Sequence, residues 1–139
     1  MHQLSQHCKV DVATIETKNN GAPTLASCDC AGFNHATFLL AVGITDVAVD
    51  CQMLESDDDS TYVAIADSDI TQIADTGDDR QVAIEIDLTA GVRKRYLRPS
   101  ITCGNSTTGA ALCGLFLLDR ADDAPVAVAD AGLAERVSV

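Results

Sequence analysis

Apolar residues recur at every second position in several short segments, and this period restricts the fold more than any other feature of the chain. Residues 81–88 place Val82, Ile84 and Ile86 on one face and polar residues on the other. Residues 46–55 alternate in the same way. Successive side chains of an extended strand point to opposite faces, so this period indicates half-buried β-strands.

Eight segments are expected to form strands: residues 8–17, 24–31, 35–43, 46–55, 62–65, 81–88, 93–103 and 110–119. Turn signals separate them about every ten residues, as in 19–23 and 104–109, and no long amphipathic helix intervenes. The sequence therefore predicts an all-β antiparallel β-sandwich, of which the jelly roll is one form. Residues 35–43 are apolar on both faces, which predicts a strand covered on both sides. A helical turn is considered at 70–73, and Pro99 marks a sheet edge or a bulge.

The chain of 139 residues is long enough for one domain. It is 47% hydrophobic but only 4% aromatic, so the core must be mainly aliphatic. We expect an N-terminal segment at 1–7, a sandwich at 8–120 and an extended C-terminal arm or tail at 121–139. The alternating positions predict a core that includes the following residues: Val47, Val49, Val82, Ile84, Ile86, Leu112 and Phe116.

The net charge of −12 disfavours nucleic acid as a partner, because a phosphate backbone would repel the chain. The sequence has no Trp and few other aromatic residues on which bases could stack. No apolar run approaches the roughly 20 residues that span a bilayer, and residues 1–7 do not resemble a signal peptide. We therefore expect synthesis and folding in a cytosol and no membrane partner.

The sequence contains six cysteines: Cys8, Cys28, Cys30, Cys51, Cys103 and Cys113. Most fall in apolar strand-like segments, which favours reduced, buried thiols that act as small hydrophobic side chains. Disulfide formation remains an alternative, and Cys103 with Cys113 flank one loop and are the pair to check. A metal site is less favoured, because the Cys28–Cys30 spacing has no second matching pair.

Four of the nine basic residues lie within six positions, at Arg93, Lys94, Arg95 and Arg98. In a strand these side chains would place positive charge on both faces. One interpretation is neutralisation of Glu85 and Asp87 on the preceding strand. The other is a partner contact, and these four residues are the candidate contact site.

The remaining polar clusters give little indication of catalysis or metal binding. Glu55 and the aspartates at 57–59 could supply oxygen ligands to Ca²⁺, but the pattern is more typical of a solvated hairpin tip. The aspartates around Gly77 are interpreted in the same way. Two of the three histidines, His2 and His7, lie near the N-terminus, and only His35 opens a strand. We expect no enzyme activity, no cofactor and no metal.

Three segments carry a resemblance to a known family. They are residues 32–38 (GFNHATF), 52–62 (QMLESDDDSTY) and 91–98 (GVRKRYLR). Together with the final apolar strand, they resemble small structural proteins of tailed bacteriophages, in particular capsid decoration or cement proteins. The resemblance covers roughly residues 32–119 and leaves out the C-terminal tail and the six-cysteine pattern.

The resemblance implies a protein on the outer surface of the virion capsid, bound to the major capsid protein and stabilising the DNA-filled head. The protein is expected to bind the shell as a homo-oligomer, either a dimer or a trimer. Two other roles stay open: a tail, fibre or head-completion protein, and a receptor- or carbohydrate-binding β-sandwich module.

Overall fold

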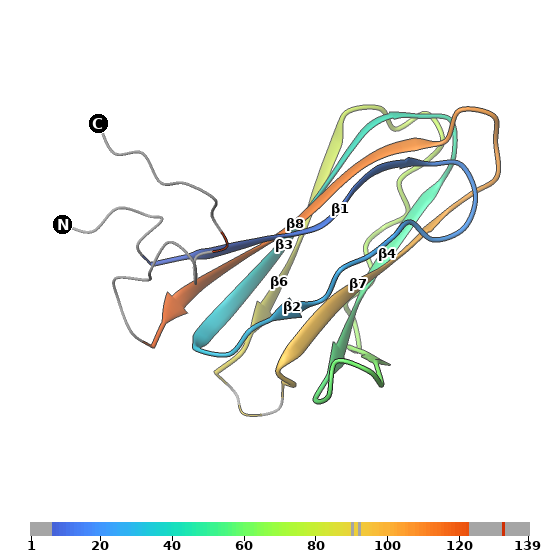
Figure 1. Cartoon of the computed structure of the whole chain (residues 1–139). Helices are drawn as coiled ribbons and strands as arrows, with labels where there is room; N and C mark the ends of the chain where they lie inside the picture. Colours follow the sequence, from blue (N-terminus) through green and yellow to red (C-terminus); the bar gives the residue numbers. More distant parts are fainter. Residues whose placement is uncertain (1–6, 90, 92, 123–131, 133–139) are drawn as a thin grey trace, which may run out of the picture.

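Eight antiparallel strands form two four-stranded sheets in the computed structural model, which describes residues 7–89, 91, 93–122 and 132. Figure 1 shows the two sheets facing each other along most of the body. The strands are β1 (Lys9–Lys18), β2 (Cys28–Asp29), β3 (Phe33–Thr45), β4 (Val49–Ser56), β5 (Val63–Ala64), β6 (Arg80–Asp87), β7 (Tyr96–Cys103) and β8 (Ala110–Ala121).

The strand order identifies the sandwich as a jelly roll. Sheet A has the order β1-β8-β3-β6, and sheet B has the order β2-β7-β4-β5. Strands therefore pair first with last: β1 with β8, β2 with β7, β3 with β6 and β4 with β5. Such pairing arises when one long antiparallel hairpin is rolled into two sheets, which is the double Greek key of the jelly roll. The predicted all-β sandwich is confirmed.

The core lies between the sheets and follows the alternation of the sequence. Of the predicted core residues, all are buried except Val82, which is half-buried against the core. Phe38 and Phe116 are fully buried cross-strand neighbours with ring centroids 5.0 Å apart. Gly114 lies beside the Phe38 ring, and a Cβ there would approach its Cζ to 2.9 Å. This aromatic pair in the core thus needs a glycine at position 114 to make room for the Phe38 ring.

Several local predictions were wrong. The strand expected at 24–31 shortens to Cys28–Asp29, and residues 70–73 form no helical turn. Residues 93–95 precede β7 instead of lying within it. The inner face of β3 is buried, but its outer face is not covered by described residues, and Leu39 keeps 39% of its surface exposed.

Pro99 is accommodated within β7. It pairs with Met53 of β4 on one side. On the other side, the pairing of β7 with β2 stops at Leu97, which lies opposite Cys28. The next described bridge along β7 joins Cys103 to Gly21. Pro99 lies between these two contacts, where this side of β7 resembles a sheet edge, as expected for a residue that cannot donate a backbone hydrogen bond. No helix in the described residues is long and apolar enough to cross a membrane.

Candidate partner-binding end of the sandwich

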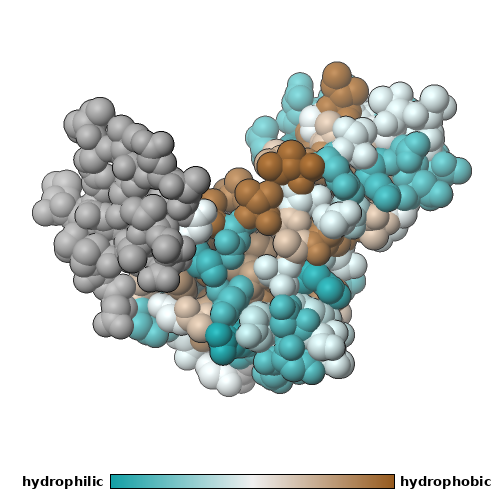
Figure 2. Space-filling model, viewed as in Figure 1, coloured by the Kyte–Doolittle hydropathy of each residue, from teal (hydrophilic) through white to brown (hydrophobic). Residues whose placement is uncertain are grey.

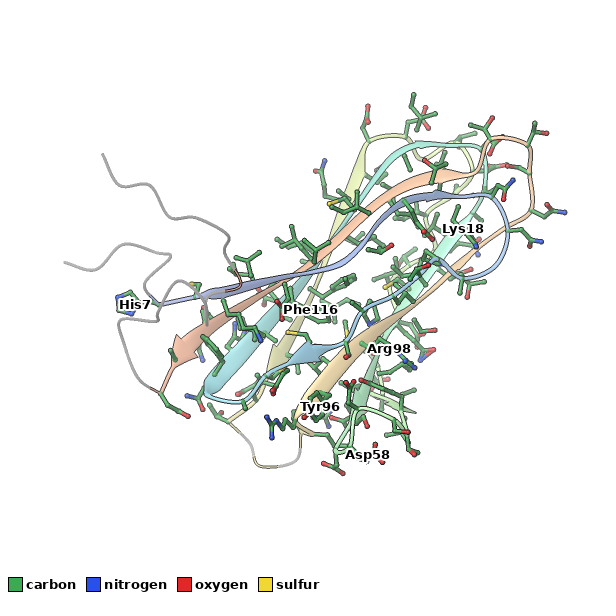
Figure 3. All side chains as sticks on the ribbon, viewed as in Figure 1. His7, Lys18, Asp58, Tyr96, Arg98 and Phe116 are labelled. Atoms are coloured by element: carbon green, nitrogen blue, oxygen red, sulfur yellow. The ribbon has the colours of Figure 1, made fainter. Side chains whose placement is uncertain are left out.

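The four basic candidate residues gather at one end of the sandwich, where β4 ends and β7 begins. Ser56, the last residue of β4, pairs with Tyr96, the first residue of β7. Figure 3 labels Tyr96 and Asp58 at this end, with Arg98 further along β7. The connection from β6 to β7 leaves sheet A and enters sheet B here, and it carries Arg93, Lys94 and Arg95.

Each of these three side chains is paired with a carboxylate of the same chain. Arg95 donates two hydrogen bonds to Asp29, from Nε to Oδ1 at 2.9 Å and from Nη2 to Oδ2 at 2.8 Å. This bidentate contact lowers the pKa of Asp29 to about 2. Lys94 lies 3.3 Å from Asp57. We call this group the charged end, and it comprises Asp29, Glu55, Asp57, Arg93, Lys94 and Arg95.

Glu55 forms the buried part of the charged end. Its carboxylate accepts a hydrogen bond from the Lys94 backbone N–H at 3.1 Å, and Arg93 Nη1 lies 3.6 Å away. Glu55 is only 7% exposed, so these two donors compensate for the loss of hydration. They tie the β6–β7 connection to the end of β4.

Arg98 differs from the other three because it stacks on an aromatic ring. Its guanidinium lies 3.9 Å from the centroid of Tyr62, which is within cation–π range. Tyr62 in turn donates a hydrogen bond to Asp59 in the acidic turn. The turn itself is organised by Asp58, which accepts bonds from Ser56, Ser60 and Thr61. The acidic turn thus acts as a hydrogen-bonded hairpin tip.

The carboxylates at the charged end are not the ones that the sequence suggested. Glu85 and Asp87 were the expected partners, but they lie on β6 in sheet A, whereas β7 belongs to sheet B. The partners instead come from Asp29, Glu55 and Asp57, on or next to strands of sheet B. These carboxylates lie far from the basic run in the sequence, so no local pattern could predict the pairing. The role of the basic run in partner contact stays a prediction.

A shallow hollow of about 260 Å³ opens beside the basic side chains. It is lined by residues around the turn before β3 and by residues of the β6–β7 connection: Cys30, Ala31, Gly32, Phe33, Leu88, Arg93, Lys94 and Arg95. The charged residues that line this hollow are the three basic ones, Arg93, Lys94 and Arg95.

The cysteine and histidine predictions have separate outcomes. All six cysteines are free thiols, and all except half-exposed Cys113 are buried. Cys103 is buried whereas Cys113 lies on the outer face of sheet A, so the suggested pair is not formed. His35 forms a 2.7 Å contact with Asp119. No group of three His, Cys, Asp or Glu side chains among the described residues could hold a metal ion.

These features define an eight-stranded jelly-roll protein with an internally paired charged end. No protein-family model and no curated protein matches the sequence. Among solved structures, the chain is similar to PBSX exported protein XepA, with 17% identity and a TM-score of 0.57. The match covers 100% of this chain and 44% of XepA, so this chain spans less than half of that protein. At this identity the similarity shows a shared fold.

Proposed function

We propose that this chain is a decoration protein of a tailed-bacteriophage head, bound to the outer surface of the assembled major capsid protein shell. One observation carries the proposal. The three segments that resemble phage decoration proteins, residues 32–38, 52–62 and 91–98, are far apart in sequence, but each has residues at or beside the charged end. Gly32 and Phe33 line the adjacent hollow, whereas Glu55 with Asp57 and residues 93–95 belong to the charged end itself. Segments that share a pattern and also share a surface are better explained by a common contact than by folding alone.

The fold adds weaker support. Jelly rolls recur in viral capsid domains, and the chain shares its fold with the PBSX exported protein XepA. Because one fold serves many functions, the argument rests on the charged end and takes the fold only as compatible.

The proposed role is mechanical. The Lys94–Asp57 pair is accessible, with 34% and 75% of the two side chains exposed. Docking can therefore exchange these contacts for equivalent contacts with capsid subunits at little cost, since exposed ion pairs contribute at most about 1 kcal/mol. Binding to the assembled shell alone then stabilises that state by mass action. Many such sites together would oppose rupture of the packed head.

Particles that lack the protein provide the test. They are expected to assemble but to release DNA at a lower temperature, and added purified protein should restore the original value. Lys94→Glu should bind the particles weakly because it places a third carboxylate beside Glu55 and Asp57. Arg80→Glu is the matched control, because it makes the same charge change at the start of β6, at the opposite end.

Two results would overturn the proposal. Depleted particles that are as heat-stable as complete ones would exclude a cement role. Equal binding of both variants would show that the charged end is not the contact. A count of only a few copies per particle would favour the tail, fibre or head-completion alternative.

A further inference from the structure

The outer face of sheet A is apolar and uncovered by the described residues. On three of its four strands, β1, β8 and β3, the outward positions carry no charged side chain between the ends of the strands. Val12 is 51% exposed, Ile15 is 70% exposed, and Leu39 is 39% exposed. Figure 2 shows hydrophobic atoms along this side of the body. We call this surface the outer apolar face: Val10, Val12, Ile15, Thr17, Thr37, Leu39, Ala41, Gly43, Ala111, Cys113, Leu115 and Leu117.

The relief of the outer apolar face changes along the strands. Leu39 and Leu115 are paired neighbours that stand out from the middle of the face, with Leu117 beyond them. Toward the other end the side chains become small. There, Ala41, Gly43 and Ala111 line a shallow trough of about 420 Å³, whose other lining residues are Ile15, Glu16 and Thr17 of β1 and Leu112 and Cys113 of β8. The face therefore has a raised leucine half and a hollow half on the same two strands.

We propose that a second copy of this chain covers the outer apolar face, in a two-fold pair with sheets A stacked face to face. If the strands of the two copies run in opposite directions, the leucine half of each copy lies over the hollow half of the other. A two-fold contact requires this kind of self-complementarity, because each surface meets its own copy. Cys113 lies between the two halves, paired with Ala41 and Ile15, and therefore lies near the two-fold axis.

Charge does not oppose a second copy as the occupant of the outer apolar face. Two chains of net charge −12 repel each other wherever their carboxylates meet. The outer apolar face has no carboxylate among its own side chains. The nearest ones, Glu16 on β1, Glu85 on β6 and Asp119 near the end of β8, lie at its margin, and Glu16 accepts a hydrogen bond from the Thr24 backbone N–H. At the start of β1, Gly132 lies against the Val10 backbone, so the pair is centred further along, near Cys113.

The size of the face is sufficient for a specific pair. A rise of about 3.4 Å per residue and a strand spacing of about 4.8 Å give roughly 27 by 19 Å for the whole outer side of sheet A, β6 included. Two stacked sheets of this size would bury on the order of 1,000 Å², which is the lower range for specific interfaces. The outer apolar face itself covers three of the four strands, roughly 27 by 14 Å, and an exposed apolar patch of a few hundred Å² is often functional.

The oligomeric state of the purified full-length chain tests the proposal without any phage particle, so its outcome is independent of the proposed function. Light scattering coupled to size exclusion should give a dimer. Ala41→Glu places a charge in the hollow half and should give a monomer with unchanged circular dichroism. Ala64→Glu is the matched control on an exposed strand position of sheet B, and it should remain dimeric.

Thiol cross-linking gives a second measurement that needs no destabilising variant. A short bis-maleimide should join two copies through Cys113, and Cys113→Ser should abolish the product. Cys113 is the half-exposed thiol, whereas the other five are buried. A wild-type monomer at high concentration, a trimer, a dimer that persists in folded Ala41→Glu, or a dimer that the reagent does not join would each overturn the proposed pair.

Discussion

Substitution of Gly114 by alanine tests the packing of the only aromatic pair in the described core. A Cβ at this position would lie 2.9 Å from Cζ and 3.1 Å from Cε2 of Phe38, and 3.4 Å from Cγ2 of Thr14. Phe38 is 0% exposed and is held by Phe116, so its ring has little room to move. We therefore expect Gly114→Ala to destabilise the fold.

The expected magnitude follows from two opposing effects. Overpacking a well-packed core costs about 1–3 kcal/mol. Replacing glycine by alanine also restricts the unfolded chain, which stabilises the folded protein by about 0.4–1 kcal/mol. The net loss should be about 1–2 kcal/mol, which for a domain of this size lowers the melting temperature by about 3–8 °C.

Thermal unfolding followed by far-UV circular dichroism measures this loss. Gly104→Ala is the control, because its nearest contacts, to Val47 and Ala48, would be at 3.6 Å and beyond. Phe38→Leu removes the ring atoms that the new methyl group would meet. In that background Gly114→Ala should cost much less, which a double-mutant cycle detects as coupling. Equal melting temperatures for Gly114→Ala and wild type, or no coupling to Phe38, would refute the argument.

Three further results are expected. In the native protein a thiol reagent should modify Cys113 quickly and the five buried cysteines slowly; burial raises the pKa of Cys51, for example, to about 12. All six thiols should react after denaturation. Rapid reaction of several cysteines in the native protein would contradict this expectation. The Asp29–Arg95 contact should contribute stability above about pH 4 that is lost as the pH falls toward 2, because the pKa of Asp29 is lowered from 3.8 to about 2. During acid titration, Asp29→Asn should lose less stability than the wild type between about pH 4 and pH 2. The difference should be less than about 1 kcal/mol, because the Asp29–Arg95 pair is partly exposed. Thr14→Val should raise the melting temperature slightly, since Thr14 Oγ1 is buried without a hydrogen-bond partner in the described part of the chain; a lower value would indicate a bond to water.

The alternation of apolar residues was sufficient to predict the all-β sandwich, the long strands and most of the core. It works because one face of each long strand is buried, and a shift of one residue would expose every apolar side chain on that face. The same reasoning failed for β3. Thr37, Leu39 and Ala41 are apolar or neutral, so the sequence cannot distinguish a face covered by its own chain from one left open.

The charged end was only half predictable. The basic run is visible as a local excess of charge, but its partners depend on which sheet each strand joins. Asp29 meets Arg95 only because β2 pairs with β7, and Glu55 meets Lys94 only because β4 lies on the other side of β7. Strand order is a non-local property that periodicity does not encode.

The two proposed contacts use different parts of the molecule and can operate together. The outer apolar face belongs to sheet A, whereas the charged end is built mainly from sheet B and from the β6–β7 connection that enters it. A pair formed through sheet A would therefore leave both charged ends free, related by the two-fold axis. Because the strands of the two copies run in opposite directions, the two charged ends would lie at opposite ends of the pair. Where both ends reach capsid subunits, the second contact would form at high effective concentration once the first is made. Weak, exposed ion pairs would then be enough for firm attachment, and Ala41→Glu should weaken particle binding even though residue 41 lies outside the charged end.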